Sequence, residues 1–364
     1  MTLLDRYIAA RFISSLLRTL VALVMLYILI DFIAGRQDDI AGKDVPAGVV
    51  LQYYWNLLPQ LIYRMMPLSV LLAGLLVFGD AAQHNEITAA LAAGISMRRI
   101  TRGPIVIALV VAGAVFMLDQ VIGADAMRTA RALEANYFKR NPDVTRPGVS
   151  WANLDNSWTC HILKYNRVAN TGEDVFLHSI REDAAEQIHA HRIYWDPNRR
   201  DGEGAWILED GIWVVFEPDV DRKRSARRIT QVEAPIAETP EQLFALDERP
   251  DTKPADQLAE DIARAAARGL PAGPYWVSWH AKYAIPALNF VMIWLAIPFA
   301  MRVRRGGLAI GFGMSLSIAM TYLVLFATCM ALGHGGHLSP AAAAWTPNAV
   351  FFALGLFLYA RTPT

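Results

Sequence analysis

The sequence contains few charged residues and few cysteines for its length. Only 19% of its 364 residues are charged, whereas a typical soluble domain has about 25%. The formal net charge is zero, so no overall positive field favours nucleic acid as a partner. The two cysteines, Cys160 and Cys329, fall in a mixed-polar and an apolar segment. Neither a disulfide nor a metal site built on cysteine is expected from them.

Several motifs that carry chemistry are also missing. The chain has no G-x-x-x-x-G-K-[ST] loop to cradle phosphates and no H-E-x-x-H pair to bind zinc. His334 and His337 are separated by two glycines and have no carboxylate nearby, so a loop without metal is favoured there. Sequence order assembles no Ser, His and Asp set. The sequence therefore predicts no catalytic, cofactor-binding or metal-binding residue in this chain.

Apolar residues, by contrast, are abundant: they make up 54% of the chain, and the mean hydropathy is positive. A membrane-spanning helix needs about 20 predominantly apolar residues. Six stretches qualify or nearly qualify, at about 12–34, 57–79, 104–122, 283–301, 308–332 and 341–360. The first is too long for a signal peptide and lacks a clear cleavage site, so it is predicted to be a membrane anchor.

The arginines and lysines of the short loops predict an orientation. With the N-terminus inside, the inner loops and termini hold nine arginines: Arg6, Arg11, Arg98, Arg99, Arg102, Arg302, Arg304, Arg305 and Arg361. The short loops on the opposite side hold only Arg36 and Lys43. This asymmetry fits the positive-inside rule and an even number of spans. Both termini are therefore expected in the cytoplasm, and the large segment between the third and fourth spans outside it.

That large segment, residues 125–274, has a different character. A helical continuation over 126–138 is followed by seven short runs with strand character, which turn residues such as Asp196-Pro197-Asn198 and Asp210-Gly211 separate. A helix is expected over 254–269. The pattern is typical of an antiparallel sandwich or jelly roll. The predicted fold class is an α-helical membrane protein with six transmembrane helices and an inserted antiparallel β domain, divided at 1–124, 125–274 and 275–364.

A polar stretch, Asp80 to Arg102, interrupts the second and third apolar runs. Asn85 can cap a short helix that Glu86 begins and Gly94 ends, and Ser96 can open the next helix. Arginines at 98, 99 and 102 follow. A compact helix at the membrane face is a suitable docking site for a partner protein. From periodicity and composition alone, a solvated loop with ordinary positive-inside arginines is favoured.

Basic residues also follow the first and third spans at the opposite membrane boundary. Arg36 and Lys43 come after the first span, and Arg128 and Arg131, three residues apart on one helix face, come after the third. Two interpretations stay open. The side chains snorkel to lipid phosphates, or they form a basic rim that holds the phosphates of an anionic amphiphile. Asp119, near the end of the third span, is expected to pair with one of these arginines.

Five motifs together carry a resemblance to a known family. They are L-L-D-R-Y-I-A-A-R-F at 3–12, M-P-L-S-V-L-L-A-G-L-L-V-F-G at 66–79, N-E-I-T-A-A-L-A-A-G-I-S at 85–96, H-A-K-Y-A-I-P-A-L at 280–288 and L-S-P-A-A-A-A-W-T-P-N at 338–348. With them, nearly the whole chain resembles the LptF/LptG (YjgP/YjgQ) family of lipopolysaccharide export permeases. The L-D-R-Y-I opening favours the LptG type.

The resemblance implies a non-catalytic permease subunit of an ABC exporter in the bacterial inner membrane, with the jelly-roll domain in the periplasm. It implies four partners: a second six-span subunit of the LptF type, a dimeric ATPase of the LptB type that binds ATP and magnesium, a periplasmic bridge of the LptC or LptA type, and lipopolysaccharide. Glu86 matches the acidic residue of the helix that docks into the ATPase. The expected ATPase-coupling residues are Glu86, Asn85, Arg98 and Arg99, and the expected lipid phosphate-binding residues are Arg36, Lys43, Arg128 and Arg131.

Three other functions remain as alternatives. A structural or scaffolding envelope protein would need neither an acidic docking helix nor a lipid cavity. A paralogous permease would keep the mechanism with another amphiphilic lipid as cargo. A membrane enzyme acting on lipid headgroups would need a cluster of catalytic side chains at one interface, which the sequence does not suggest.

Overall fold

The computed structural model describes residues 3–33, 45–138, 145–153, 158–166, 169–180, 185–199, 204–216, 224–236, 239–240, 252–267, 272–302 and 307–361. The chain divides into two compact units. The first contains Met1–Glu134, Pro250–Ala259 and Gly273–Thr364, and the second contains Ala135–Arg249 and Glu260–Ala272.

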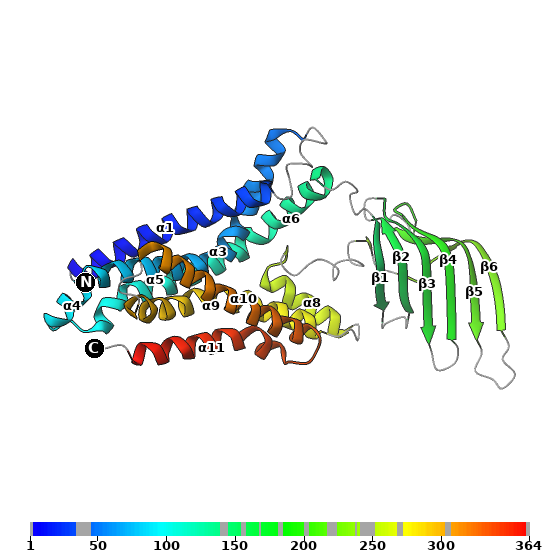
Figure 1. Cartoon of the computed structure of the whole chain (residues 1–364). Coiled ribbons are helices and arrows are strands. Elements are labelled where there is room, and N and C mark those ends of the chain that lie inside the picture. Colours follow the sequence, from blue (N-terminus) through cyan, green and yellow to red (C-terminus); the bar gives the residue numbers. More distant parts are fainter. Residues whose placement is uncertain are drawn as a thin grey trace. The chain divides into compact units, whose positions relative to one another are not determined.

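Six helices of the first unit are long and apolar enough to cross a membrane, which confirms the predicted number of spans. They are α1 (Leu3–Asp31), α3 (Ala47–Gln83), α5 (Met97–Leu118) with its continuation, α9 (Gly273–Arg302), α10 (Gly307–His334) and α11 (Pro340–Ala360) (Figure 1). The third continues through a π-helical turn, η2 (Asp119–Gly123), into α6 (Ala124–Leu133) and a second π turn, η3 (Glu134–Phe138). The predicted helical continuation over 126–138 is thereby confirmed.

Helices α3 and α9 form the centre of this unit. In their most apolar windows, 67% and 72% of the residues are buried, against 22%, 22% and 17% in the first, third and fifth spans. Helix α9 contacts α3, α5, α10 and α11, while α1 packs on α3 and α5. Val70 and Leu71 of α3 and Ile293 and Ala296 of α9 are fully buried in one hydrophobic core. The outer helices therefore turn apolar faces away from the unit, as helices in contact with lipid do.

Polar side chains inside the bundle are paired between helices. The Tyr322 hydroxyl of α10 donates to Oδ1 of Asn348 of α11 at 2.9 Å, and Nδ2 of Asn348 donates to the Ala284 carbonyl of α9 at 2.7 Å. The hydroxyls of Thr101 of α5 and Tyr359 of α11 lie 3.2 Å apart. Since hydrocarbon offers no hydrogen-bond partner, such contacts between helices satisfy groups that would otherwise be costly to bury.

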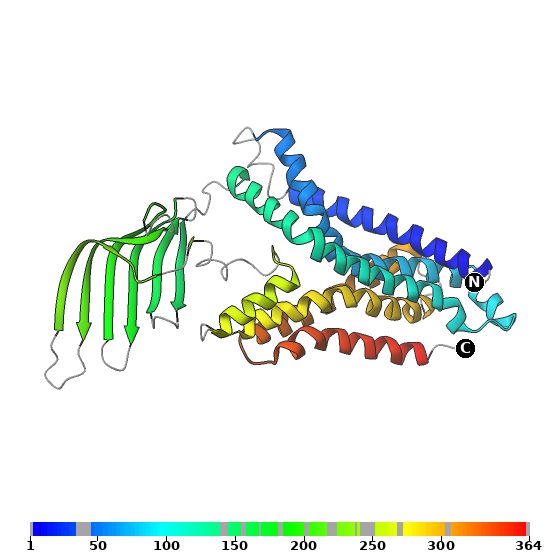
Figure 2. The ribbon, with the colours of Figure 1, turned by 180° about the vertical axis from the view of Figure 1, so that it is seen from behind.

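The second unit is built on one antiparallel sheet. Its strands are β1 (Thr145–Asn153), β2 (Trp158–Asn166), β3 (Thr171–Ile180), β4 (Ala185–Asp196), β5 (Ala205–Phe216) and β6 (Arg224–Glu233), side by side in chain order (Figure 2). Alternate residues of β2, such as Trp158, Cys160 and Ile162, are buried in the core. Burial raises the pKa of the Cys160 thiol to about 12. Cys160 and Cys329 are both free.

The sheet confirms the inserted antiparallel β domain. Its six described strands follow one another in a single meander. Short connections favour this order because each strand then pairs with its neighbour in sequence. The turn predicted at Asp210-Gly211 lies inside β5. Asp210 adopts a φ of +50° there, and the register on both sides continues unchanged.

Gly74 sets the close approach of α3 to α9. A Cβ at this position would lie 2.5 Å from the Cβ of Ala296, whereas one at Gly79 of the same helix would meet no heavy atom within 4 Å. We expect G74A to destabilise the protein by about 1–3 kcal/mol through overpacking and to lower its melting temperature in detergent. G79A is the matched control, because it adds the same methyl group in open space. Equal melting temperatures for the two variants would contradict the close packing.

Candidate functional site

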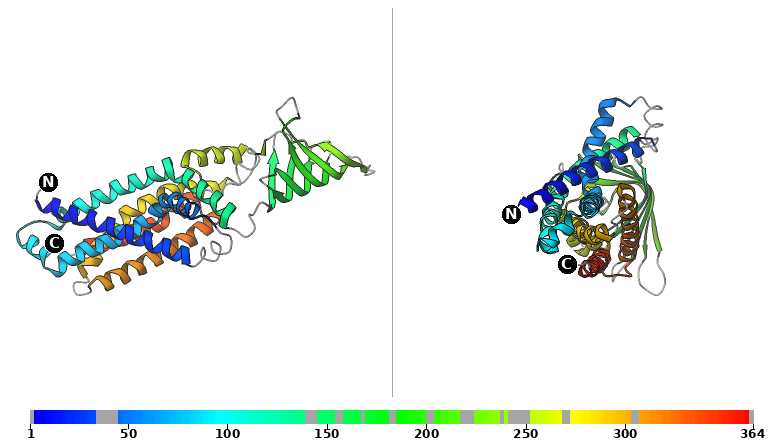
Figure 3. Two further views of the ribbon diagram at one scale, coloured as in Figure 1. Left: turned by 90° about the horizontal axis from the view of Figure 1, so that it is seen from above. Right: turned by 60° about the vertical axis from the view of Figure 1, so that its left-hand side comes forward.

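A short helix, α4 (Glu86–Ala92), connects α3 to α5 at the end of the unit where both chain termini lie (Figures 1 and 3). Gly94 follows it with a φ of +79°, so the predicted helix and its glycine stop are confirmed. The role predicted for Asn85 is corrected. Asn85 adopts a left-handed φ of 60° and its side chain makes no capping hydrogen bond. Its carbonyl accepts instead from the amide of Ala89 at 2.9 Å, because a left-handed residue turns the chain sharply into the helix.

One apolar side chain anchors α4 to the spans. Ile87 is 5% exposed and belongs to the same core as Ile8 of α1, Phe78 of α3 and Ile100 of α5. Thr88 and Ala89 on the following positions are exposed. Helix α4 therefore has a buried side that is fixed to three spans and an outer side that is free for a partner.

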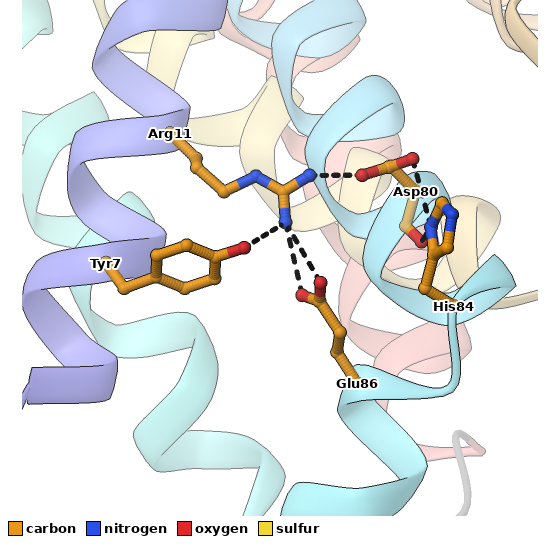
Figure 4. A network of polar contacts seen from close by, with 5 residues as sticks. All are labelled: Tyr7, Arg11, Asp80, His84 and Glu86. Carbon is orange, nitrogen blue, oxygen red and sulfur yellow. Dashed lines mark hydrogen bonds and ion pairs between the residues drawn. The ribbon is translucent and has the colours of Figure 1, made fainter.

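An arginine of the first span holds the start of α4. Arg11 Nη1 donates to Glu86 Oε2 at 3.1 Å and to the Tyr7 hydroxyl at 2.9 Å, and Arg11 Nη2 pairs with Asp80 at the end of α3 (Figure 4). Nδ1 of His84 lies 3.2 Å from Oδ1 of Asp80. These five residues are called the Arg11 cluster below. It joins α1, α3 and α4 through one guanidinium.

The charges of the Arg11 cluster remain accessible. Arg11 is 29% exposed, whereas Asp80 and Glu86 are 44% and 42% exposed. Exposed ion pairs contribute only about 0.2–1 kcal/mol each. Arg11 therefore orients Glu86 but leaves acceptor sites of its carboxylate available to a partner, since a carboxylate has about four lone-pair sites. The site can present a negative charge at a fixed place on the surface of the membrane helices.

The other predicted coupling residues lie near α4 without joining the Arg11 cluster. Arg98 and Arg99 are exposed in the first turn of α5, and within the described part of the chain neither pairs with Glu86. Asn85 is exposed beside Glu86. Together they form a polar surface around α4, with Glu86 as its acidic member.

The predicted lipid-binding residues are only partly described. Arg36 and Lys43 lie outside the described residues. Arg128 and Arg131 lie on α6, where Arg128 Nη1 donates to Asp125 Oδ1 at 3.0 Å and Nη2 donates to Gln257 of α8 (Ala255–Ala267). The expected partner of Asp119 is wrong. Asp119 pairs with Lys282 of α9 at 2.9 Å, because the buried side of α5 faces α9 while the two arginines lie beyond the π turn.

Comparison with known proteins decides the family. The family model described as "Lipopolysaccharide export system permease LptF/LptG" matches residues 6–361. This chain belongs to the LptF/LptG family. Two relatives are both described as "Lipopolysaccharide export system permease protein LptG", from Escherichia coli strain K12 and from Escherichia coli O6:H1 strain CFT073. Each is 21% identical over 373 residues, covering 98% of both chains. The chain is thus a multi-pass membrane protein of a lipopolysaccharide export permease family.

Sequence reasoning for this LptF/LptG chain found Glu86 but missed the residues that orient it. Arg11 was counted among the positive-inside residues, and Tyr7, Asp80 and His84 had no predicted role. Arg11 and Tyr7 are four residues apart, which places them on one helix face. Nothing in the sequence relates Arg11 to Glu86, 75 positions later. Among the described residues, no three His, Cys, Asp or Glu side chains gather as a metal site would require.

We expect R11Q to loosen α4, because Glu86 would lose its cation while Ile87 keeps its apolar anchor. Backbone amides of 86–92 should exchange hydrogen up to about fivefold faster, the factor that corresponds to about 1 kcal/mol. Hydrogen exchange of the full chain in lipid nanodiscs measures this. R18Q is the matched control, since Arg18 lies two turns further along α1 and its Nε donates to the Ser14 carbonyl. Equal exchange in the two variants would contradict the role of Arg11.

Proposed function

We propose that this LptF/LptG chain is a non-catalytic transmembrane subunit of an ATP-driven exporter. The exporter extracts lipopolysaccharide from the bacterial inner membrane and passes it to a periplasmic bridge toward the outer membrane. The family match over residues 6–361, together with an acidic helix fixed at one end of six spans, carries this proposal. ATP and magnesium would bind to a separate ATPase, and this chain would convert the motion of that ATPase into transport.

The proposed orientation places both termini and α4 in the cytoplasm and the β sheet in the periplasm. The arginine-rich inner loops support it through the positive-inside rule. It puts Glu86 on the side of the membrane where ATP is available. The domain division proposed from the sequence, with spans at 1–124 and 275–364 around a periplasmic segment at 125–274, accompanies this orientation.

The proposed partners follow from what each surface offers. Helix α4, with Glu86 at its start and exposed positions behind it, offers a dimeric LptB-like ATPase a docking point. Spans α1 and α10 turn apolar faces outward, with Leu17 and Val21 of α1 and Leu323 and Val324 of α10 all more than half exposed. A second, LptF-like six-span subunit would cover part of these faces and enclose a lipid cavity. A bridge of the LptC or LptA type would receive the lipid at the β domain.

In the proposed cycle the ATPase moves α4, and the contacts of Ile87 and Arg11 transmit that motion to α1, α3 and α5. The cavity between the two subunits would then narrow and expel the lipid. Transport results only if the cargo has different affinities for the open and closed cavities. A scaffold without transport remains the second candidate, and it would leave α4 without an ATPase partner.

We expect E86K to weaken association with the ATPase by at least tenfold, which corresponds to about 1.4 kcal/mol, or to uncouple ATP hydrolysis from lipid export. The physical reason is that the substitution places a cation where the docked partner meets a carboxylate. Co-purification of the complex and lipid transfer in proteoliposomes measure the two effects. E260K is the matched control, because Glu260 is also an exposed carboxylate paired with an arginine and belongs to α8 rather than to α4.

R11Q separates two causes of an E86K defect. If the lost Arg11 contact alone mattered, R11Q would reproduce the E86K defect in full. Normal complex yield and normal export in E86K would overturn the docking role and favour the scaffold.

For the lipid, we expect the double variant R128E/R131E to lower the lipopolysaccharide that co-purifies with the complex. Two guanidinium groups suited to phosphate are replaced there by carboxylates that repel it. Mass spectrometry of bound lipid per complex measures the change, and R264E is the control for charge reversal on another helix, α8. An unchanged lipid content would exclude Arg128 and Arg131 from the basic rim. A different lipid lost in the same experiment would keep the rim and change the cargo.

A further inference from the structure

A buried ion pair lies where the third span leaves its α-helical geometry. Lys282 Nζ of α9 lies 2.9 Å from Asp119 Oδ2, and their side chains are 8% and 1% exposed. Both residues belong to helices that are candidate membrane spans. Charges within a membrane span are costly unless they meet a partner, and they mark positions with a role.

The carboxylate of Asp119 is the junction of a larger network. Its Oδ2 also accepts from Nε2 of Gln120 at 3.1 Å, and Oε1 of Gln120 accepts from the backbone amide of Ala255 at 2.6 Å. Ala255 is the first residue of α8. The first amides of a helix have no partner within the helix, so Gln120 supplies from another helix the acceptor that an N-cap residue normally provides.

Asp119 and Gln120 also begin the π turn η2. A π turn carries one extra residue compared with an α-helical turn and is frequently found at functional positions. One extra residue rotates the following side chains by about 100° around the helix axis. The π turn therefore decides which face of α6 carries Arg128, whose Nη2 contacts Gln257 in the first turn of α8.

We propose that Asp119, Gln120 and Lys282 form a polar clamp that docks the first turn of α8 on the ends of the third and fourth spans and thereby positions Arg128. Lys282 holds Asp119, Asp119 orients the amide of Gln120, and Gln120 holds the amide of Ala255. The Arg128–Gln257 contact then closes a second link between α6 and α8. The three residues are positioning residues, since they act through α8 and Arg128.

The π turn packs closely against the carboxylate of Asp119. Asp119 Oδ1 is buried and has no hydrogen-bond partner within the described structure. A Cβ at Gly123 would lie 3.3 Å from this oxygen, so the π turn wraps closely around the carboxylate. The other oxygen, Oδ2, serves Lys282 and Gln120 together, so the carboxylate connects the ion pair to the residue that holds Ala255.

Hydrogen exchange of the full chain in lipid nanodiscs tests the polar clamp. D119N, K282M and Q120A should each raise the exchange rate of the amides at 255–259 at least fivefold, while the amides of α4 at 86–92 keep their rate. Q120A is the sharpest variant because it leaves the ion pair intact and removes only the acceptor for Ala255. The charge-swapped double variant D119K/K282D keeps opposite charges on the two helices but gives Gln120 Nε2 no acceptor, since an ammonium group only donates. Its exchange at 255–259 should therefore stay at least as fast as in K282M.

Y322F is the matched control. It removes a buried interhelical hydrogen bond in the same unit, between α10 and α11, and should leave the exchange of 255–259 unchanged. Unchanged exchange at 255–259 in Q120A would overturn the polar clamp. An increase spread equally over all spans in D119N and K282M would also overturn it, as would recovery of protection at 255–259 in the charge-swapped double variant. The exchange of 255–259 does not depend on which lipid is exported. Failure of the polar clamp would therefore leave the proposed export function untouched, and failure of the proposed export function would leave the polar clamp untouched.

Discussion

The pairing of polar side chains between helices governs the membrane unit of this chain. Inside six apolar helices a charge or an amide has no water to bind, so each polar side chain is useful only where another helix supplies its partner. Three contacts between helices show this. Asn348 joins α9, α10 and α11, Arg11 joins α1, α3 and α4, and Asp119 joins α5 and α9. Each of these three contacts fixes the relation of particular helices.

Packing supplies most of the cohesion, and the polar contacts add direction. Gly74 lets α3 approach α9 closely enough that a single methyl group would collide with Ala296. Such contacts hold the helices together but do not fix the short helices at their ends. Ion pairs and hydrogen bonds fix those short helices. Arg11 orients α4 at one end of the unit, and the polar clamp fixes the start of α8 on α5 and α9. A movement imposed on α4 therefore enters a bundle that is stiff at its centre and specifically connected at its ends.

Features set by neighbouring residues could be predicted from the sequence. Hydropathy alone predicts the six spans, Gly94 predicts the end of α4, and alternation in stretches such as Trp158 to Ile162 predicts strands. The order in which strands connect is a different kind of information, because alternation says nothing about which strand lies beside which. The meander of the six described strands could be seen only in the structure. The turn predicted at Asp210-Gly211 was wrong, because both residues lie inside β5, where Asp210 adopts a positive φ.

Partners that are far apart in sequence could not be predicted. Asp119 was assigned a nearby arginine because sequence distance was the only guide, yet its partner Lys282 is 163 positions away. Glu86 was found because it matches the acidic residue of a family motif, whereas Arg11 lies in another of these motifs, at 3–12, without any sign that it pairs with Glu86. In both cases an isolated charge at the edge of an apolar run indicated that a partner must exist. Only the packing of the helices identified that partner, since it decides which faces of α1, α3, α5 and α9 meet.

The two polar clusters differ in a way that suits different tasks. The Arg11 cluster is partly exposed, so water screens its ion pairs and a partner protein can compete for Glu86 at small cost. The Asp119–Lys282 pair is almost completely buried, so separating the two charges would leave both of them uncompensated in an apolar surrounding. A contact that must open and close during a transport cycle belongs to the first kind, and a contact that must survive the cycle belongs to the second. By this physical criterion the flexible step of the proposed cycle would lie at α4, while α8 and Arg128 would move together with the third and fourth spans.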